Sequence, residues 1–199
     1  ELVAFVVFLR PLGLRLDGVM IAIYTIKDQY FPVMGGTVIR QDWMDALGYK
    51  SIDSIDQMDD FLRDCKSTYG AGYPLMLTYS NYENILSAAY GIGGGDCTNG
   101  LYQVDGDVRY TYVQPEYKEY LKLAAAWYQD GIIGSDFMNV GTTGLPMETY
   151  TYVYSGDTAI IGATAAEIAS IEAETGNGCK LIGFNYPASD GSGVTHFTD

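Results

Sequence analysis

A short helix with a built-in stop, followed directly by a long amphipathic helix, is the feature that most constrains how this chain can fold. The segment RQDWMDALG runs from Arg40 to Gly48 and places an arginine at the expected end of a strand, a short amphipathic turn, and then a glycine suited to end a helix. In the next segment, SIDSIDQMDDFLRDC, Ser54 and Gln57 have the spacing of a capping box. Apolar residues then recur with helical period, at Ile55, Met58, Phe61, Leu62 and Cys65. The two segments predict a strand, a short helix, and a long helix with one buried face.

Strand and helix signals alternate along the rest of the chain. Strands are expected at residues 20–26, 36–40, 73–79, 158–162 and 181–186. A helix is expected after Asn81, and Thr164 with Glu167 forms a second capping box. The Asp105-Gly106 pair between two β-rich runs predicts a hairpin. This alternation predicts an α/β fold with a central sheet.

A further helix is expected from Pro115, which suits a first helical position, to the glycine cap at Gly131. Its apolar stripe is expected to be packing, and so are both tryptophans, Trp43 and Trp127. The stripe consists of Tyr117, Tyr120, Leu121, Ala124, Trp127 and Tyr128. The glycine- and threonine-rich stretch that follows this helix is expected to be a loop.

The order and spacing of three segments resemble extracellular family 1 solute-binding proteins, the sugar-type substrate-binding components of ABC importers. The segments are RQDWMDALG with the capped helix after it, EYKEYLKLAAAWYQDGII at 116–133, and YSGDTAIIGA at 154–163. The resemblance covers roughly residues 17–199. It implies a periplasmic-binding-protein-like lobe of type II, with a central mixed sheet flanked by helices.

The resemblance also implies how the chain is organised. In that family two lobes joined by a hinge hold the ligand between them. Residues 1–35 would be a partial first-lobe and hinge crossover, 36–185 the second lobe, and 186–199 a return segment toward the hinge. Gly35 and Gly36 would serve the hinge, because glycine tolerates the backbone changes of closure. The chain is then expected to begin inside a longer protein.

Ligand contacts are expected where a strand ends and a helix begins, since clefts of open α/β sheets form there. The loop after the strand at 73–79 contributes ligand contacts in the resembled family, and a glycine-rich loop and a helix N-terminus supply the other candidates. The expected ligand-binding residues are Tyr79, Ser80, Asn81, Tyr82, Asp96 and Thr164. The family often has an aromatic residue near Ala165, and the alanines at 165 and 166 would leave a roomier pocket.

Charge and composition exclude some functions and favour others. A formal net charge of −14 argues against nucleic acid, because phosphate binding needs clustered basic residues. Eighteen tyrosines favour a sugar ligand, since each offers a flat apolar face and a hydroxyl that donates and accepts. The resemblance adds an ABC permease as partner, a monomer, and an extracellular or cell-surface location with a lipoprotein anchor in the full-length protein.

Catalysis finds little support in the sequence, so we expect a binding protein and not an enzyme, with no catalytic residue, metal or cofactor. The single histidine, His196, lies in a Gly/Ser-rich tail, and no G-x-S-x-G elbow or C-x-x-C pair is present. A disulfide between Cys97 and Cys179 stays open. Three alternative functions also stay open. They are a secreted carboxylate-dependent glycoside hydrolase that uses Glu83 and Asp96, the binding of a peptide or other small polar solute, and a purely structural or adhesive domain.

Overall fold

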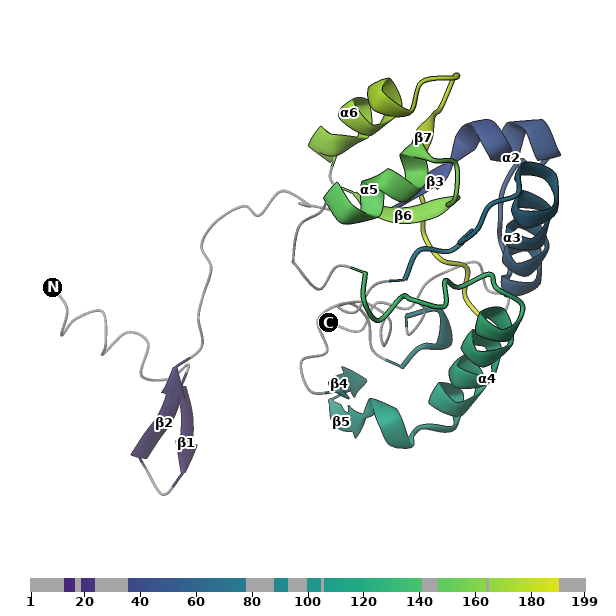
Figure 1. Cartoon of the computed structure of the whole chain (residues 1–199). Coiled ribbons are helices and arrows are strands. Elements are labelled where there is room, and N and C mark those ends of the chain that lie inside the picture. Colours follow the sequence, from purple (N-terminus) through teal and green to yellow (C-terminus); the bar gives the residue numbers. More distant parts are fainter. Residues whose placement is uncertain are drawn as a thin grey trace, which may run out of the picture. The chain divides into compact units, whose positions relative to one another are not determined.

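The computed structural model describes residues 13–16, 19–23, 36–77, 88–92, 100–104, 106–140, 147–163 and 165–189. The chain divides into two compact units, Glu1–Pro32 and Val33–Asp199, and each is described by itself (Figure 1). Within the described ranges, no helix is long and apolar enough to cross a lipid bilayer.

The smaller unit contains an antiparallel pair of strands. β1 (Gly13–Leu16) pairs with β2 (Val19–Ile23), with a shift in register between Leu14 and Arg15. β2 confirms the first part of the strand predicted at 20–26, whose remaining residues lie outside the described part of the chain.

The larger unit is built on a mixed sheet. β3 (Gly36–Arg40) lies between β6 (Ile160–Ala163) and β7 (Leu181–Gly183) and pairs antiparallel with both. Leu75 then extends the sheet through parallel bridges to Ile160 and to Ile133. The predicted α/β fold with a mixed central sheet is therefore confirmed.

Two strand predictions were too long. Over the described residues, the strand expected at 73–79 is reduced to bridges at Leu75 alone, and Pro74 before it has no backbone N–H to give to a ladder. The strand expected at 181–186 pairs with β3 only as far as Gly183, and one further bond joins the Phe184 N–H to the Thr37 carbonyl at 2.9 Å.

The helices after β3 form as the sequence predicts. α2 (Gln41–Leu47) ends at Gly48, whose φ of 84° is the left-handed conformation that glycine adopts without strain. α3 (Ile55–Tyr69) is capped at its N-terminus by Ser54, whose hydroxyl accepts from the Gln57 N–H at 3.2 Å. The Gln57 side chain accepts from the backbone N–H of Asp53, one residue earlier than in the usual capping box.

The predicted hairpin and the helix after it are also confirmed. β4 (Leu101–Val104) pairs antiparallel with β5 (Asp107–Tyr110). One 3₁₀ turn, η4 (Thr111–Val113), leads into α4 (Pro115–Gln129), and another, η2 (Ala88–Tyr90), precedes the hairpin. α4 ends in a Schellman motif: the N–H groups of Gly131 and Ile132 donate to the carbonyls of Tyr128 and Trp127.

One helix was missed. α5 (Met147–Tyr154) lies in the stretch expected to be a loop, and it packs beside α6 (Ala165–Thr175). Its β-branched and aromatic residues have weak helix propensity, but Tyr150 and Val153 are buried against the sheet and α6. Tertiary packing therefore stabilises a helix that local propensity does not predict.

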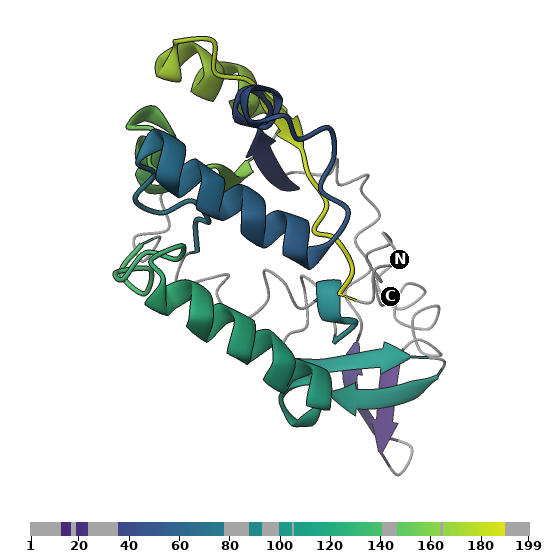
Figure 2. The same ribbon diagram turned by 90° about the vertical axis from the view of Figure 1, so that its right-hand side faces the viewer.

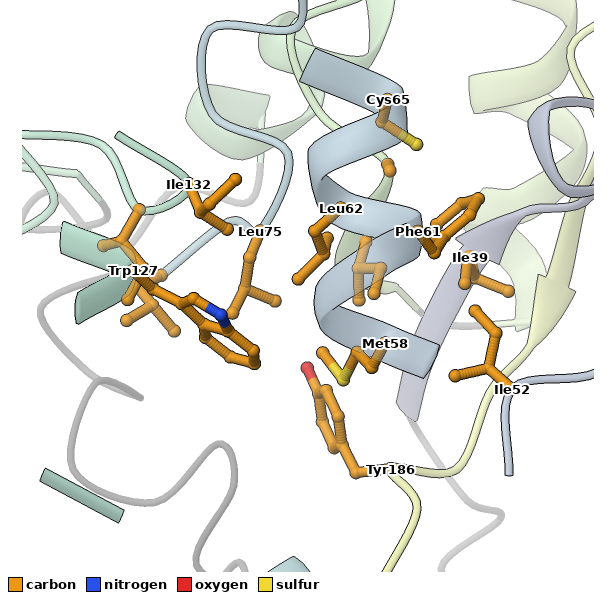
Figure 3. Packing of buried hydrophobic residues seen from close by; sticks show 14 of the residues in the cluster. Ile39, Ile52, Met58, Phe61, Leu62, Cys65, Leu75, Trp127, Ile132 and Tyr186 are labelled. Atoms are coloured by element: carbon orange, nitrogen blue, oxygen red, sulfur yellow. The ribbon is translucent and has the colours of Figure 1, made fainter. Parts of the chain in front are cut away.

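Helices cover both faces of the sheet, as the alternation of its residues shows. Val38 and Ile161 pack with α5 and α6, whereas their chain neighbours Ile39 and Ile160 face the cluster built around α3. Figure 3 shows the α3 side chains pointing between Ile39 of β3 and Trp127 of α4. This larger core confirms the predicted buried face of α3, with Met58, Phe61, Leu62 and Cys65 fully buried and Ile55 partly so.

Candidate functional site

The residues predicted to bind ligand lie outside the described part of the chain. They are Tyr79, Ser80, Asn81, Tyr82, Asp96 and Thr164, together with Gly35 of the predicted hinge. Glu83, Cys97 and His196 lie outside it as well. Gly36 is described: it is the first residue of β3 and is paired with Ala163.

The described framework defines one edge of the sheet at which ligand groups can gather. Leu75 runs parallel to both Ile133 and Ile160, so the carboxyl ends of these three segments point the same way. In sequence, residues 79–82 follow the first segment and Thr164 follows the third. In open α/β sheets, this carboxyl edge is where ligand clefts form.

A polar groove of about 350 Å³ lies between residues 134–140 and α5. The residues that line it are Asp136, Asn139, Val140, Thr151 and Tyr152. Its first wall leaves the sheet directly after Ile133 and folds into successive tight turns. Backbone bonds fix these turns, because the N–H groups of Phe137, Asn139 and Val140 donate to carbonyls three residues earlier at 3.2, 2.7 and 3.2 Å. Buried Val140 anchors the end of the wall in the smaller core cluster.

Tyr152 forms the other wall of the polar groove, and its ring is held by a neighbouring ring. Tyr73 meets Tyr152 edge to face, with centroids 5.4 Å apart and an interplanar angle of 70°. The Tyr73 ring in turn lies against Gly134, where a Cβ atom would come within 2.5 Å of Tyr73 Cδ1. Gly134 is therefore needed for close approach, and it fixes where both rings lie.

A second, apolar groove of about 320 Å³ lies along α4. Two α4 residues that the sequence analysis assigned to packing, Leu121 and Tyr128, are 47% and 45% exposed and border this groove. The core covers only part of the α4 stripe, although the Tyr128 ring also meets Phe137 edge to face with centroids 6.0 Å apart. Tyr120 and Trp127 take the buried positions. The remaining lining residues are Leu77, Tyr120, Ala124, Ala125, Ile133 and Phe137.

The R-x-D-W motif at residues 40–43 has a structural role. Arg40 donates to both carboxylate oxygens of Asp42, at 2.8 and 2.5 Å, and its guanidinium lies 4.5 Å from the centroid of Trp43. Asp42 also accepts from the backbone N–H of Lys180, just before β7. Burial opposes the charge on Arg40, but the Asp42 carboxylate outweighs it, so the pKa of Arg40 is raised. Trp43 stacks on Tyr69 with centroids 4.4 Å apart. The motif thus ties α2 to α3 and β7.

A second structural network joins α3 to α4, which lie next to each other (Figure 2). The indole N–H of Trp127 donates to the Asp59 carboxylate at 2.6 Å, and Arg63 pairs with both Asp59 and Asp130. Lys66 donates to the carbonyls of Asp130 and Gly131, at the C-terminal end of α4. Cationic groups are favoured at that end of a helix.

The described titratable groups offer few reactive centres. Among the described residues, no group of three or more His, Cys, Asp or Glu side chains is placed to hold a metal ion. Cys65 and Cys179 are free and buried, so the disulfide left open for Cys179 is not formed. Burial raises the pKa of both thiols, which disfavours the thiolate that a nucleophile requires.

No model of a known protein family matches the chain, and no curated protein sequence does either. Solved structures match its fold. They include a HMO-binding, ABC-transporter-associated solute-binding protein from Bifidobacterium longum infantis (18% identity, TM-score 0.61, covering 78% of this chain and 34% of that one). They also include the S. pneumoniae substrate-binding protein FusA with fructo-nystose (18%, TM-score 0.56, 78% and 31%) and maltose-bound T. maritima MalE3 (13%, TM-score 0.56, 79% and 39%).

These similarities establish the fold, which is that of periplasmic-binding-protein-like solute-binding proteins. The chain spans only about a third of the length of the solved structures named above. The described sheet, its two helical layers and its carboxyl edge therefore correspond to one part of a larger architecture.

Proposed function

We propose that this chain is the greater part of the second lobe of an extracellular solute-binding protein that delivers a sugar or oligosaccharide to an ABC importer. It works by capture and not by catalysis. The observation that carries the proposal is a groove with an aromatic wall and polar groups, in a unit whose fold is shared with sugar-binding proteins.

The chemistry of the polar groove supports a saccharide ligand. A sugar ring offers an apolar face for stacking and many hydroxyls for directed hydrogen bonds, and pockets for small ligands combine apolar walls with a few placed polar groups. Solved structures of this fold carry fructo-nystose and maltose. A shared fold does not fix the ligand, so the ligand class depends on the groups of this chain.

The proposal assigns roles to residues beyond the described ranges. Tyr79, Ser80, Asn81, Tyr82, Asp96 and Thr164 contact the ligand. Gly35 and Gly36 form the hinge between a crossover segment, residues 1–35, and the second lobe, residues 36–185, with residues 186–199 returning toward the hinge. The full-length protein is a monomer at the cell surface, anchored as a lipoprotein, and it passes its ligand to a membrane permease.

Ligand binding by the 199-residue chain tests the proposal directly. Maltotriose, raffinose and kestose are titrated by calorimetry, and the thermal midpoint is followed in parallel. A ligand that binds only the native state at a hundred times its Kd stabilises it by about 2.7 kcal/mol, so the midpoint rises. Recovery of the sugar unchanged distinguishes capture from turnover.

Tyr82→Ala provides the matched variant. It should weaken the affinity for the sugar that binds best and leave the melting temperature nearly unchanged, because a ring that lines a cleft contributes little to the core. Absence of binding to all three sugars overturns the proposal. Turnover of a sugar that is lost in Glu83→Gln would instead establish a hydrolase.

A further inference from the structure

We propose that the polar groove is a saccharide subsite that takes one uncharged pyranose unit against the ring of Tyr152. This inference rests on the proposed function and deepens it, since it assigns a subsite to described residues and names the class of sugar. It is carried by four features of the groove: its hydrogen-bonding groups, its aromatic wall, its size and its charge.

The groove presents the groups that vicinal sugar hydroxyls need. Asp136 offers a carboxylate that accepts strong, charge-assisted hydrogen bonds from hydroxyls. Asn139 and Thr151 add an amide and a hydroxyl to the lining, and each also has an interaction within the protein. A sugar hydroxyl also donates and accepts, so this mixed set matches a polyol better than it matches an apolar or purely anionic ligand.

Tyr152 supplies a flat face whose position is fixed before ligand arrives. It is half-buried, with its ring held by Tyr73, and Tyr73 is held in turn against the backbone at Gly134. A positioned ring loses little conformational freedom when a sugar stacks on it, so less binding free energy is lost in ordering it. The contacts to Tyr73 therefore favour a binding role for the Tyr152 ring.

The volume of the groove limits how much sugar it can hold. At about 350 Å³ it lies near the lower end of the range of about 300–1,000 Å³ typical of small-molecule sites. That space suits a single ring with its hydroxyls. A longer oligosaccharide would extend beyond the groove.

Charge separates neutral from acidic sugars. The described residues that line the groove include Asp136 but no Lys or Arg, and the chain as a whole has a formal charge of −14. A uronate would bring a second carboxylate close to Asp136, and like charges at short range repel. The groove is therefore selective for uncharged units.

Calorimetric titration of the 199-residue chain with maltotriose, raffinose, kestose and trigalacturonate tests the subsite. The neutral sugar that binds best is then carried to the variants. Tyr152→Ala should weaken its binding at least about tenfold, which corresponds to about 1.4 kcal/mol, whereas Tyr152→Phe should retain most of the affinity because it keeps the ring. Tyr69→Ala is the matched control, because it removes a partly exposed ring that stacks on Trp43 and does not line the groove.

Gly134→Ala tests the positioning of the ring without touching the ligand. The added methyl group must displace the ring of Tyr73, so affinity should fall by about threefold or more while the fold is retained. Gly162→Ala in β6 is the control, because a Cβ atom there meets nothing within 4 Å. Asp136→Asn should weaken binding of the neutral sugar and improve binding of trigalacturonate.

The outcomes separate the two proposals. If a neutral sugar binds and neither Tyr152→Ala nor Gly134→Ala changes its affinity, the subsite is refuted and the proposed function stands. Tighter binding of trigalacturonate than of every neutral sugar refutes the selectivity. If no sugar binds to the unmodified chain, both proposals fail.

Discussion

Trp43→Ala should be among the most damaging single substitutions in this chain, although no ligand contact is assigned to Trp43. Its ring is 7% exposed, stacks on Tyr69 at 4.4 Å and lies under the guanidinium of Arg40 at 4.5 Å. Truncating a buried aromatic residue costs about 3–5 kcal/mol from lost burial and the cavity it leaves. That range includes the lost stacking on Tyr69, which is worth about 0.5–1.5 kcal/mol as an aromatic pair.

Urea denaturation followed by far-UV circular dichroism measures the effect, since this signal comes mainly from the backbone. Val108→Ala, at a side chain 73% exposed on the hairpin, is the control and should change stability by less than about 0.5 kcal/mol. A double-mutant cycle with Tyr69→Ala should give a coupling of about 0.5–1.5 kcal/mol. A loss below about 1 kcal/mol for Trp43→Ala would refute the structural role assigned to the R-x-D-W motif.

Two further predictions concern buried and helix-end groups. Lys66→Met should lower the free energy of unfolding by about 1–2 kcal/mol, because the ammonium donates to two carbonyls at the end of α4. Lys122→Met is the control, because the partner of Lys122, Glu119, is exposed, and it should change the free energy of unfolding by less than about 0.5 kcal/mol. An equal loss of stability in the two variants would contradict the stabilising role given to the Lys66 contacts. In a Cys97→Ser background, Cys65 and Cys179 should react with a thiol reagent only on unfolding, because burial raises the pKa of both thiols. In the unfolded chain these thiols ionise near a pKa of about 8.5, whereas in the folded protein they stay protonated to higher pH. The free energy of unfolding should therefore be unaffected below about pH 8.5 and should fall as the pH rises above it, and the urea midpoint from pH 7 to 10 measures this.

The framework could be predicted where short-range chemistry decides the structure. Ser54 must accept from the backbone for α3 to begin, Gly48 and Gly131 take left-handed conformations that end α2 and α4, and Gly106 turns the hairpin. Each of these requirements involves residues within a few positions of one another. Sequence spacing alone therefore locates them.

The parts that were missed depend on distant contacts. α5 is a helix because Tyr150 and Val153 are buried under neighbouring elements, and Leu75 is the only bridged residue among the described residues 73–77, where a whole strand was expected. Asp136, which lines the polar groove, follows the apolar run that ends at Ile133, so the rule that candidate ligand groups follow strand ends could have singled it out. Tyr152 had no such signal, because its helix was not predicted.

The residues that carry the resemblance are not those that would choose a ligand. Arg40, Asp42 and Trp43 contact one another, Tyr69 and the backbone before β7, so any substitution among them is felt by several elements at once. By contrast, a change at Asp136 or Asn139 alters a groove wall whose shape is set by backbone bonds within residues 134–140. Stability therefore constrains the first set more tightly than the second. The fold is accordingly still shared with solved structures at less than 20% identity.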